Sequence, residues 1–194
     1  MIVLASASKA RSRMLTQAGV SHLVEVSRID EDDIKQREAH HIPDRLAVRL
    51  AEAKAGDVSL RHPGMLVLGA DQVLVCSGRP FSKPKTYEEA KEQLLALKGR
   101  THRLVSAAVL VQDGVKLWHG CLEARLHMRS FSDAFLKLYL EREGENVLHS
   151  VGAYRVEGPG AQLFETIEGD HFTVQGLPLL PLLEELRRQG EIMA

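Results

Sequence analysis

Apolar residues in the first part of the chain predict one strand and two helices. Residues 2–5 form an apolar run typical of a strand, and apolar positions then recur at helical spacing from Ser8 to Gly19. Ser is a common helix N-cap and Gly a common C-terminal stop, so these two residues set the ends of the helix. Residues 43–55 begin with a Pro, and apolar residues are interspersed among the charged residues that follow it. This pattern predicts a second, amphipathic helix.

The segment at residues 65–75 is apolar enough for a buried strand, and Gly69 and Asp71 interrupt it. The pattern leaves two interpretations of Asp71: an acid inside the strand that faces a cation, or a loop residue after a strand that ends at Gly69. Residues 86–99 open with a Thr-x-x-Glu pattern and end at Gly, which predicts a helix.

The remaining pattern predicts further strands and helices. Residues 102–128 predict a hairpin that turns at Asp113-Gly114. Helices are expected over 132–143 and 177–190, with glycine-rich loops and short strands between them. Because this order lacks a clean βαβ repeat, we expect an α/β fold in a single domain over residues 1–194, with a central mixed, twisted sheet wrapped by helices and a cleft between two lobes.

The composition mainly excludes classes of partner. The chain is 44% hydrophobic and 26% charged, as globular proteins are, and its formal net charge of -1 offers no cationic excess for a nucleic-acid backbone. We therefore expect no membrane and no polymeric nucleic acid as a partner. Two cysteines, Cys76 and Cys121, and the absence of a secretory pattern near the start predict a cytoplasmic protein.

The turn from Ser6 to Arg11 is the first candidate site. Free backbone N–H groups at a helix start, two hydroxyls, Lys9 and Arg11 favour a bound anion, and a capped surface helix is the alternative.

Four charged residues are further candidates. Lys83 lies twelve residues after Asp71, and a short hairpin between them would return its amine toward the Asp; a solvated loop lysine is the alternative. Glu31 stands in an acidic run and Lys54 on a charged helix, and both settings are usually solvated.

Eight short blocks follow one another along the chain: LASASKAR, DE, EAKA, GADQV, FSKP, LKGRTH, VGAYRVEG and IEGDHFTVQGLP. In this order they resemble the motifs of the Maf family of nucleoside triphosphate pyrophosphatases. The resemblance spans nearly the whole chain and implies a Maf/inosine-triphosphatase-like fold. It also implies hydrolysis of a nucleoside triphosphate to the monophosphate and pyrophosphate, a house-cleaning activity.

The resemblance implies a role for each matching residue. Phosphate binding falls to Ser6, Ser8 and Arg11. The implied catalytic residues are Asp71, Glu31, Lys54 and Lys83. Asp71 matches the family's proton acceptor, and with Glu31 it is implied to hold a divalent cation, for which carboxylate and phosphate oxygens suit Mg²⁺ or Mn²⁺.

Some positions depart from the family pattern. Lys9 replaces the usual Pro, and Ala10 replaces the first of two arginines, so Lys9 or Arg13 is a candidate substitute cation. Ser150 stands where many relatives have Lys.

Substrate specificity is expected to depend on Ala10, Gln72 and Glu157. Gln72 and Glu157 are similar to the subgroup that acts on 7-methyl-GTP, whereas members that cleave dTTP and UTP tend to have Thr and Gln. A carboxylate such as Glu157 can accept two hydrogen bonds from a guanine edge. Ala10 lacks the aromatic ring that the subgroup offers to a methylated base.

Three alternatives stay open on sequence alone. The chain can be a dTTP- or UTP-preferring member, a non-catalytic nucleotide-binding regulator of septum formation and cell division, or a pyrophosphatase of another fold. A homodimer is expected, because homodimers are the commonest assembly among soluble oligomers.

Overall fold

The computed structural model describes residues 1–38 and 43–193. The chain divides into two compact units. Unit 1 comprises Met1–Gln72, Val105–Leu122 and Asp170–Ala194, and unit 2 comprises Val73–Leu104 and Glu123–Gly169.

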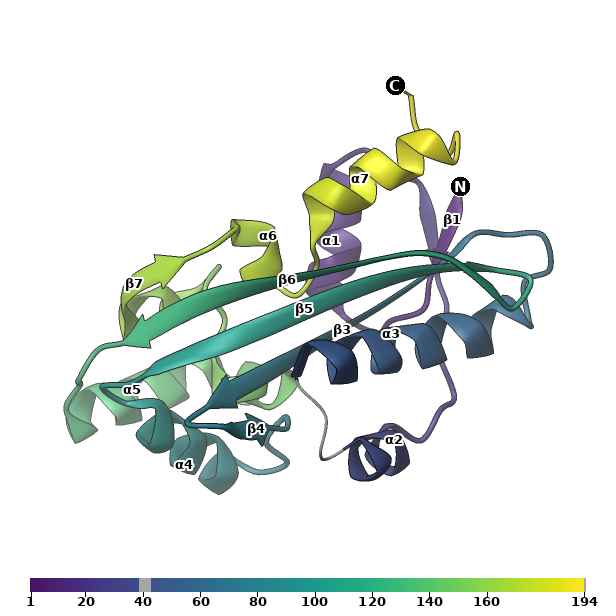
Figure 1. Ribbon diagram of the computed structural model, residues 1–194. Helices are drawn as coiled ribbons and strands as arrows, with labels where there is room; N and C mark the ends of the chain where they lie inside the picture. The colour runs from purple at the N-terminus through teal and green to yellow at the C-terminus, as the bar shows by residue number, and fades with distance from the viewer. Residues whose placement is uncertain (39–42, 194) are drawn as a thin grey trace. The chain divides into compact units, whose positions relative to one another are not determined.

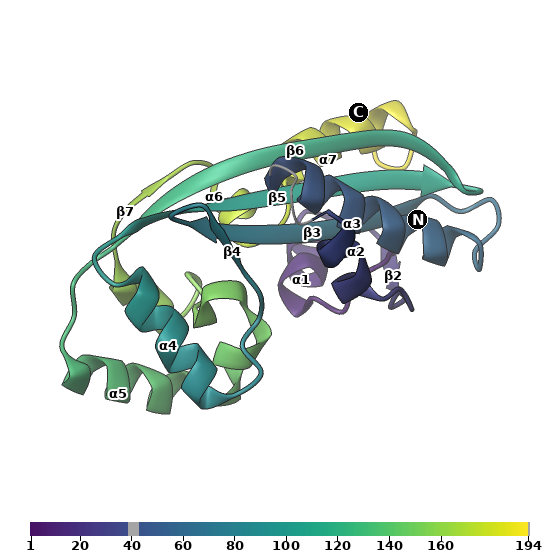
Figure 2. The same cartoon turned by 60° about the horizontal axis from the view of Figure 1, so that its bottom comes forward.

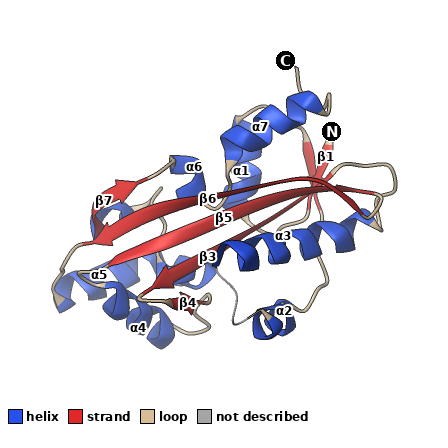
Figure 3. Ribbon diagram, in the orientation of Figure 1, coloured by secondary structure: helices blue, strands red, loops and turns tan. Residues whose placement is uncertain are grey.

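The strands confirm the predicted α/β class with a mixed sheet (Figure 3). They are β1 (Ile2–Leu4), β2 (His22–Val24), β3 (Val67–Cys76), β4 (Arg79–Phe81), β5 (Thr101–Gln112), β6 (Val115–Met128) and β7 (Phe164–Glu168). Within the described residues they pair in the order β2-β1-β3-β5-β6-β7, with β4 on β3. β1 runs parallel to β2 and β3, whereas β4 and β7 run antiparallel to their partners.

The α-helices are labelled in Figure 1. They are α1 (Lys9–Gln17), α2 (Glu31–Arg37), α3 (Pro43–Ser59), α4 (Tyr87–Leu97), α5 (Asp133–Glu143), α6 (His171–Val174) and α7 (Leu179–Arg188). Three 3-10 turns are η1 (Gly144–His149), η2 (Val151–Ala153) and η3 (Pro159–Leu163). No helix in the described part of the chain combines the length and apolar character needed to cross a membrane.

Local sequence signals account for the ends of several elements. Ser8 caps α1 and Thr86 caps α4 through their side chains, as predicted. Asp113 and Gly114 have φ of 49° and 77°, which suits the tight turn predicted between β5 and β6. Ser77-Gly78 turns in the same way between β3 and β4, so the expected hairpin between Asp71 and Lys83 is present.

Three expectations need correction. The helix predicted at 43–55 continues to Ser59, because Val58 and Ser59 are also buried. The acidic run around Glu31, a setting that is usually solvated, forms the helix α2, since Asp30 accepts hydrogen bonds from two backbone N–H groups. Glu31 contacts the buried ammonium of Lys54. The glycine-rich segment before α7 contains 3-10 turns as well as loops and one strand.

In unit 1 the two faces of β3 pack against different helices (Figures 1 and 2). Leu68 and Ala70 belong to a core cluster with residues of α1 and α7. Gly69, between them, faces Ala51 and Ala55 of α3. Since side chains alternate along a strand, Asp71 faces the α3 side and Gln72 the other.

Candidate active site

Asp71 lies inside β3, which decides between the two interpretations of this residue. It is only 8% exposed, and its Oδ1 accepts a hydrogen bond of 2.6 Å from Nζ of Lys54. Nζ of Lys54 also lies 2.9 Å from Oε1 of Glu31. One buried ammonium group thus holds two carboxylates, which offsets the cost of burying Asp71.

Gly69 explains how α3 brings Lys54 to Asp71. A Cβ placed on Gly69 would lie 2.0 Å from the carbonyl oxygen of Ala51 and 2.9 Å from Cβ of Ala55. Only a glycine therefore lets α3 approach the strand this closely. The close approach buries Lys54, which is 7% exposed, instead of leaving its amine in water.

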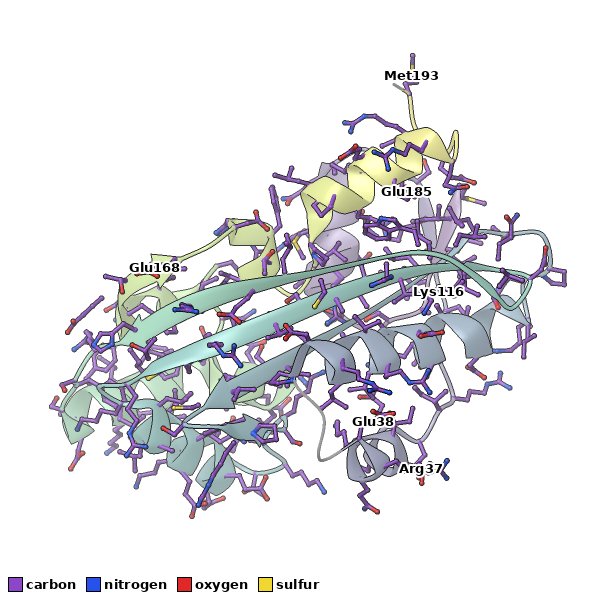
Figure 4. All side chains as sticks on the ribbon, in the orientation of Figure 1. Arg37, Glu38, Lys116, Glu168, Glu185 and Met193 are labelled. Atoms are coloured by element: carbon purple, nitrogen blue, oxygen red, sulfur yellow. The ribbon has the colours of Figure 1, made fainter. Side chains whose placement is uncertain are left out.

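Glu31 reaches the same ammonium because it opens α2. Asp30 caps this helix, and Glu31 is its first residue. Glu38, labelled in Figure 4, lies at the other end of α2. Its Oε1 is 3.6 Å from Nε of Arg49 on α3. These contacts hold α2 against α3, so the carboxylate of Glu31 stays beside Lys54.

Arg11 is buried and bound to the main chain. Its Nε donates to the carbonyl of Gly176 at 2.8 Å, and its Nη1 donates to Ser6 Oγ at 3.1 Å and to the carbonyl of Ala70 at 2.8 Å. Burial lowers the pKa of Arg11, and the nearby charge of Asp71 opposes that effect. The guanidinium therefore ties α1 to β3 next to Asp71, and its Nη2 lies outside these bonds.

A pocket of about 410 Å³ opens along α1, from the turn before the helix to its last residues, and reaches Val24 of β2. Ser6, Ser8, Lys9 and Arg13 contribute to its lining. Oγ of Ser8 also accepts the backbone N–H of Arg11 at 3.4 Å, so this hydroxyl caps the helix as well. The pocket places hydroxyls and two exposed cations where the sequence predicts an anion site.

Ala10 and Gln72, two residues expected to determine substrate specificity, have different surroundings. Ala10 is half-buried on α1. Gln72 donates its amide N–H groups to Ser106 Oγ at 3.0 Å and to the carbonyls of Thr173 and Val174 at 3.1 Å each. These partners lie on the sheet face opposite the side chain of Asp71.

Lys83 and Glu157 belong to unit 2, and their relation to Asp71 stays a prediction. Both are exposed. Within unit 2, Glu157 lies in a turn closed by a hydrogen bond from Gly158 N–H to the carbonyl of Arg155. The guanidinium of Arg155 donates twice to Oε2 of Glu143, at 3.0 and 2.9 Å, and Glu143 is 2% exposed. An ion pair with a buried carboxylate therefore anchors the turn that carries Glu157.

Ser106 and the ion pair of Glu143 with Arg155 were not predicted from the sequence. Ser106 is the polar residue inside the apolar run at 104–111, the same signal that singled out Asp71. Glu143 carried no such signal, because it ends a charged helix.

The donor set around Lys54 suits a magnesium ion better than zinc. Within residues 1–38 and 43–193 no three His, Cys, Asp or Glu side chains gather into a metal cluster. Magnesium is commonly held by one or two carboxylates together with substrate phosphates, and Asp71 and Glu31 provide two carboxylates.

Comparison with known proteins gives matches over almost the full chain. A family profile described as "Maf-like protein" matches residues 1–189. A nucleoside triphosphate pyrophosphatase of Paramagnetospirillum magneticum is 52% identical over 193 residues, covering 98% of this chain and 100% of the relative. A 7-methyl-GTP pyrophosphatase of Rhizobium etli is 47% identical, with 98% and 97% covered.

A solved structure of a dITP/XTP pyrophosphatase from Mycobacterium abscessus also matches. It has a TM-score of 0.43 at 15% identity and covers 97% of this chain and 94% of its own.

Proposed function

The chain belongs to the family of Maf-like proteins, and from this premise we propose that it hydrolyses a nucleoside triphosphate to the monophosphate and pyrophosphate. The observation that carries the proposal is the grouping of Asp71, Lys54 and Glu31 in unit 1. A buried carboxylate beside a cation is suited to take a proton from an attacking water molecule.

Asp71 is the proton acceptor in this proposal. Its Oδ1 is bound to Lys54, so its second oxygen is the one suited to orient a water molecule for attack on the α-phosphate. Lys54 holds the carboxylate in place, and its positive charge favours the negative charge that develops on the phosphates. Glu31 shares Lys54 and thereby fixes the ammonium from a second side.

We further propose that Asp71 and Glu31 hold Mg²⁺ or Mn²⁺ together with the substrate phosphates. The two carboxylates fit such a cation because both offer oxygen ligands. When bound, the ion would lower the pKa of water and neutralise phosphate charge.

The phosphates are proposed to bind beside the start of α1. Lys9 and Arg13 line the pocket there together with Ser6 and Ser8. Arg11 contributes its charge from a buried position, whereas Lys9 and Arg13 are exposed and can contact the phosphates directly. This arrangement supports the view that Lys9 and Arg13 replace the family arginine that Ala10 lacks.

A modified guanine nucleotide is the proposed substrate. Several relatives at about this level of identity are named 7-methyl-GTP pyrophosphatase, including that of Brucella abortus at 47%. Glu157 supports the same substrate because a carboxylate can accept hydrogen bonds from the guanine N1–H and amino groups. Lys83 and Glu157 enter this proposal through the family motifs that they match.

The test is pyrophosphate release from 7-methyl-GTP, GTP, dTTP and UTP, each with Mg²⁺ or Mn²⁺ and with chelator. We expect turnover that depends on the cation, is fastest for 7-methyl-GTP, and falls on the order of 100-fold or more in Asp71→Asn. Turnover fastest for dTTP or UTP would correct the substrate. No turnover of any triphosphate would support the non-catalytic regulator.

A further inference from the structure

Gln72 and Ser106 together hold one carbonyl group of α6. The amide of Gln72 donates to Ser106 Oγ at 3.0 Å and to the carbonyls of Thr173 and Val174 at 3.1 Å each. Ser106, 0% exposed on β5, donates its own hydroxyl to the carbonyl of Thr173 at 2.8 Å. Side chains of the neighbouring strands β3 and β5 thus donate hydrogen bonds to the same carbonyl group of α6.

The side-chain hydrogen-bond donors of Gln72 and Ser106 are all used within this cluster. A glutamine amide has two N–H groups, and Gln72 shares them among three acceptors. The single hydroxyl hydrogen of Ser106 points to Thr173, so its oxygen is left to accept from Gln72. All partners lie on the sheet face opposite the side chain of Asp71.

The segment held by this cluster also contacts Arg11. The carbonyl of Gly176 accepts a hydrogen bond of 2.8 Å from Nε of Arg11, whose Nη1 binds the carbonyl of Ala70 at 2.8 Å. Residues 70 and 72 flank Asp71 in β3. The segment at 170–176, called here the α6 segment, is therefore attached to the strand on both sides of the proposed catalytic acid.

We propose that Ser106 and Gln72 are positioning residues of the catalytic centre, which hold the α6 segment and, through Gly176, set Arg11 beside Asp71. The proposal rests on the proposed function. It assigns a role to Ser106, a buried residue outside the family blocks, and adds a positioning role to the specificity role expected of Gln72. Its consequence is that loss of the Ser106 hydroxyl and loss of the Gln72 amide both slow the reaction, because each removes one of the two hydrogen bonds to the carbonyl of Thr173.

The test compares Ser106→Ala and Gln72→Ala in the full chain, with Ser106→Thr as the variant that keeps the hydroxyl. Ser59→Ala is the matched control, since Ser59 is also a buried serine of unit 1 that donates to a carbonyl, that of Gly56. Steady-state kcat and KM are measured for four nucleotides, and hydrogen exchange for the amides at 173–176.

We expect Ser106→Ala and Gln72→Ala each to lower kcat/KM by at least roughly three- to tenfold, the effect of the one hydrogen bond to the carbonyl of Thr173 that each removes. Ser106→Ala should keep the same order among the nucleotides. Both variants should also exchange the amides at 173–176 faster than the wild type. Ser106→Thr should recover most of the loss, and Ser59→Ala should leave these values unchanged.

Two results would overturn the proposal. In the first, Gln72→Ala changes the relative rates among the nucleotides while Ser106→Ala behaves like Ser59→Ala, which would mean that Gln72 contacts the base itself. In the second, exchange at 173–176 is equal in Ser106→Ala and the wild type. If the wild type cleaves no nucleotide, the proposed function fails on its own, and exchange together with nucleotide dissociation constants still decides the positioning role.

Discussion

The ammonium group of Lys54 lies 2.6 Å from Oδ1 of Asp71, although the two residues belong to different elements, α3 and β3. The contact depends on how closely the helix approaches the strand. Its partner carboxylates come from a strand and from the first residue of α2, so three separate elements must pack correctly before the site exists.

Gly69→Ala should disrupt that packing. The new Cβ would lie 2.0 Å from the carbonyl oxygen of Ala51, so α3 must move outward and take Lys54 with it. We expect the free energy of unfolding to fall by about 1–3 kcal/mol or more, as overpacked cores do, and kcat to fall as well. Urea unfolding and pyrophosphate release measure the two effects.

Gly56→Ala is the matched control for this change. A Cβ on Gly56 meets no atom within 4 Å, and the residue lies inside α3. The substitution should therefore stabilise the protein by about 0.5–1 kcal/mol through helix propensity. Equal unfolding free energies for the two alanine variants would contradict the packing argument.

Lys9→Ala should weaken triphosphate binding without slowing the chemical step. Lys9 is an exposed cation that lines the pocket beside α1, and it is not part of the buried pair of Asp71 and Lys54. We expect KM to rise roughly two- to tenfold with kcat retained, and the effect to shrink at high salt because exposed charges are screened. Initial-rate kinetics at two salt concentrations check this.

Lys91→Ala serves as the control for Lys9→Ala. Lys91 is an exposed lysine on α4, in unit 2, and matches none of the motif blocks. Its loss should leave KM unchanged. An unchanged KM in Lys9→Ala would remove Lys9 from the phosphate site.

Sequence patterns were sufficient where a local signal defines the structure. Caps at Ser8 and Thr86 and the turn at Asp113-Gly114 depend on a few neighbouring residues, so their elements could be predicted. Asp71 stood out as the acid in an apolar run, but only the strand itself decided between its two interpretations.

Contacts between distant segments could not be predicted in the same way. α2 has seven residues and no buried side chain, so its sequence resembles a solvated acidic run, and contacts with α3 hold it in place. The bond between Gln72 and Ser106 joins residues 34 positions apart and depends on strand register. A single sequence shows neither that register nor the burial of Lys54.

His102 in unit 2 predicts a loss of stability in acid. It is 1% exposed, its Nε2 lies 2.7 Å from the hydroxyl of Tyr154, and its Nδ1 is buried with no hydrogen-bond partner among the described residues. Burial, and to a smaller extent the charge of His127, lowers the pKa of His102 from 6.5 to about 4. The folded protein therefore keeps this imidazole neutral, whereas the unfolded chain takes up a proton first as the pH falls.

The stabilising effect is full above pH 6.5 and decreases as the pH falls toward 4, by up to about 3 kcal/mol. Urea unfolding of the wild type and of His102→Gln at pH 7, 5.5 and 4 measures it. Because glutamine does not titrate, the variant should be less stable at pH 7, where it loses the packing of the ring, yet lose less stability on acidification. The difference between the two proteins should therefore narrow with falling pH, and a constant difference would mean that His102 does not carry the acid sensitivity.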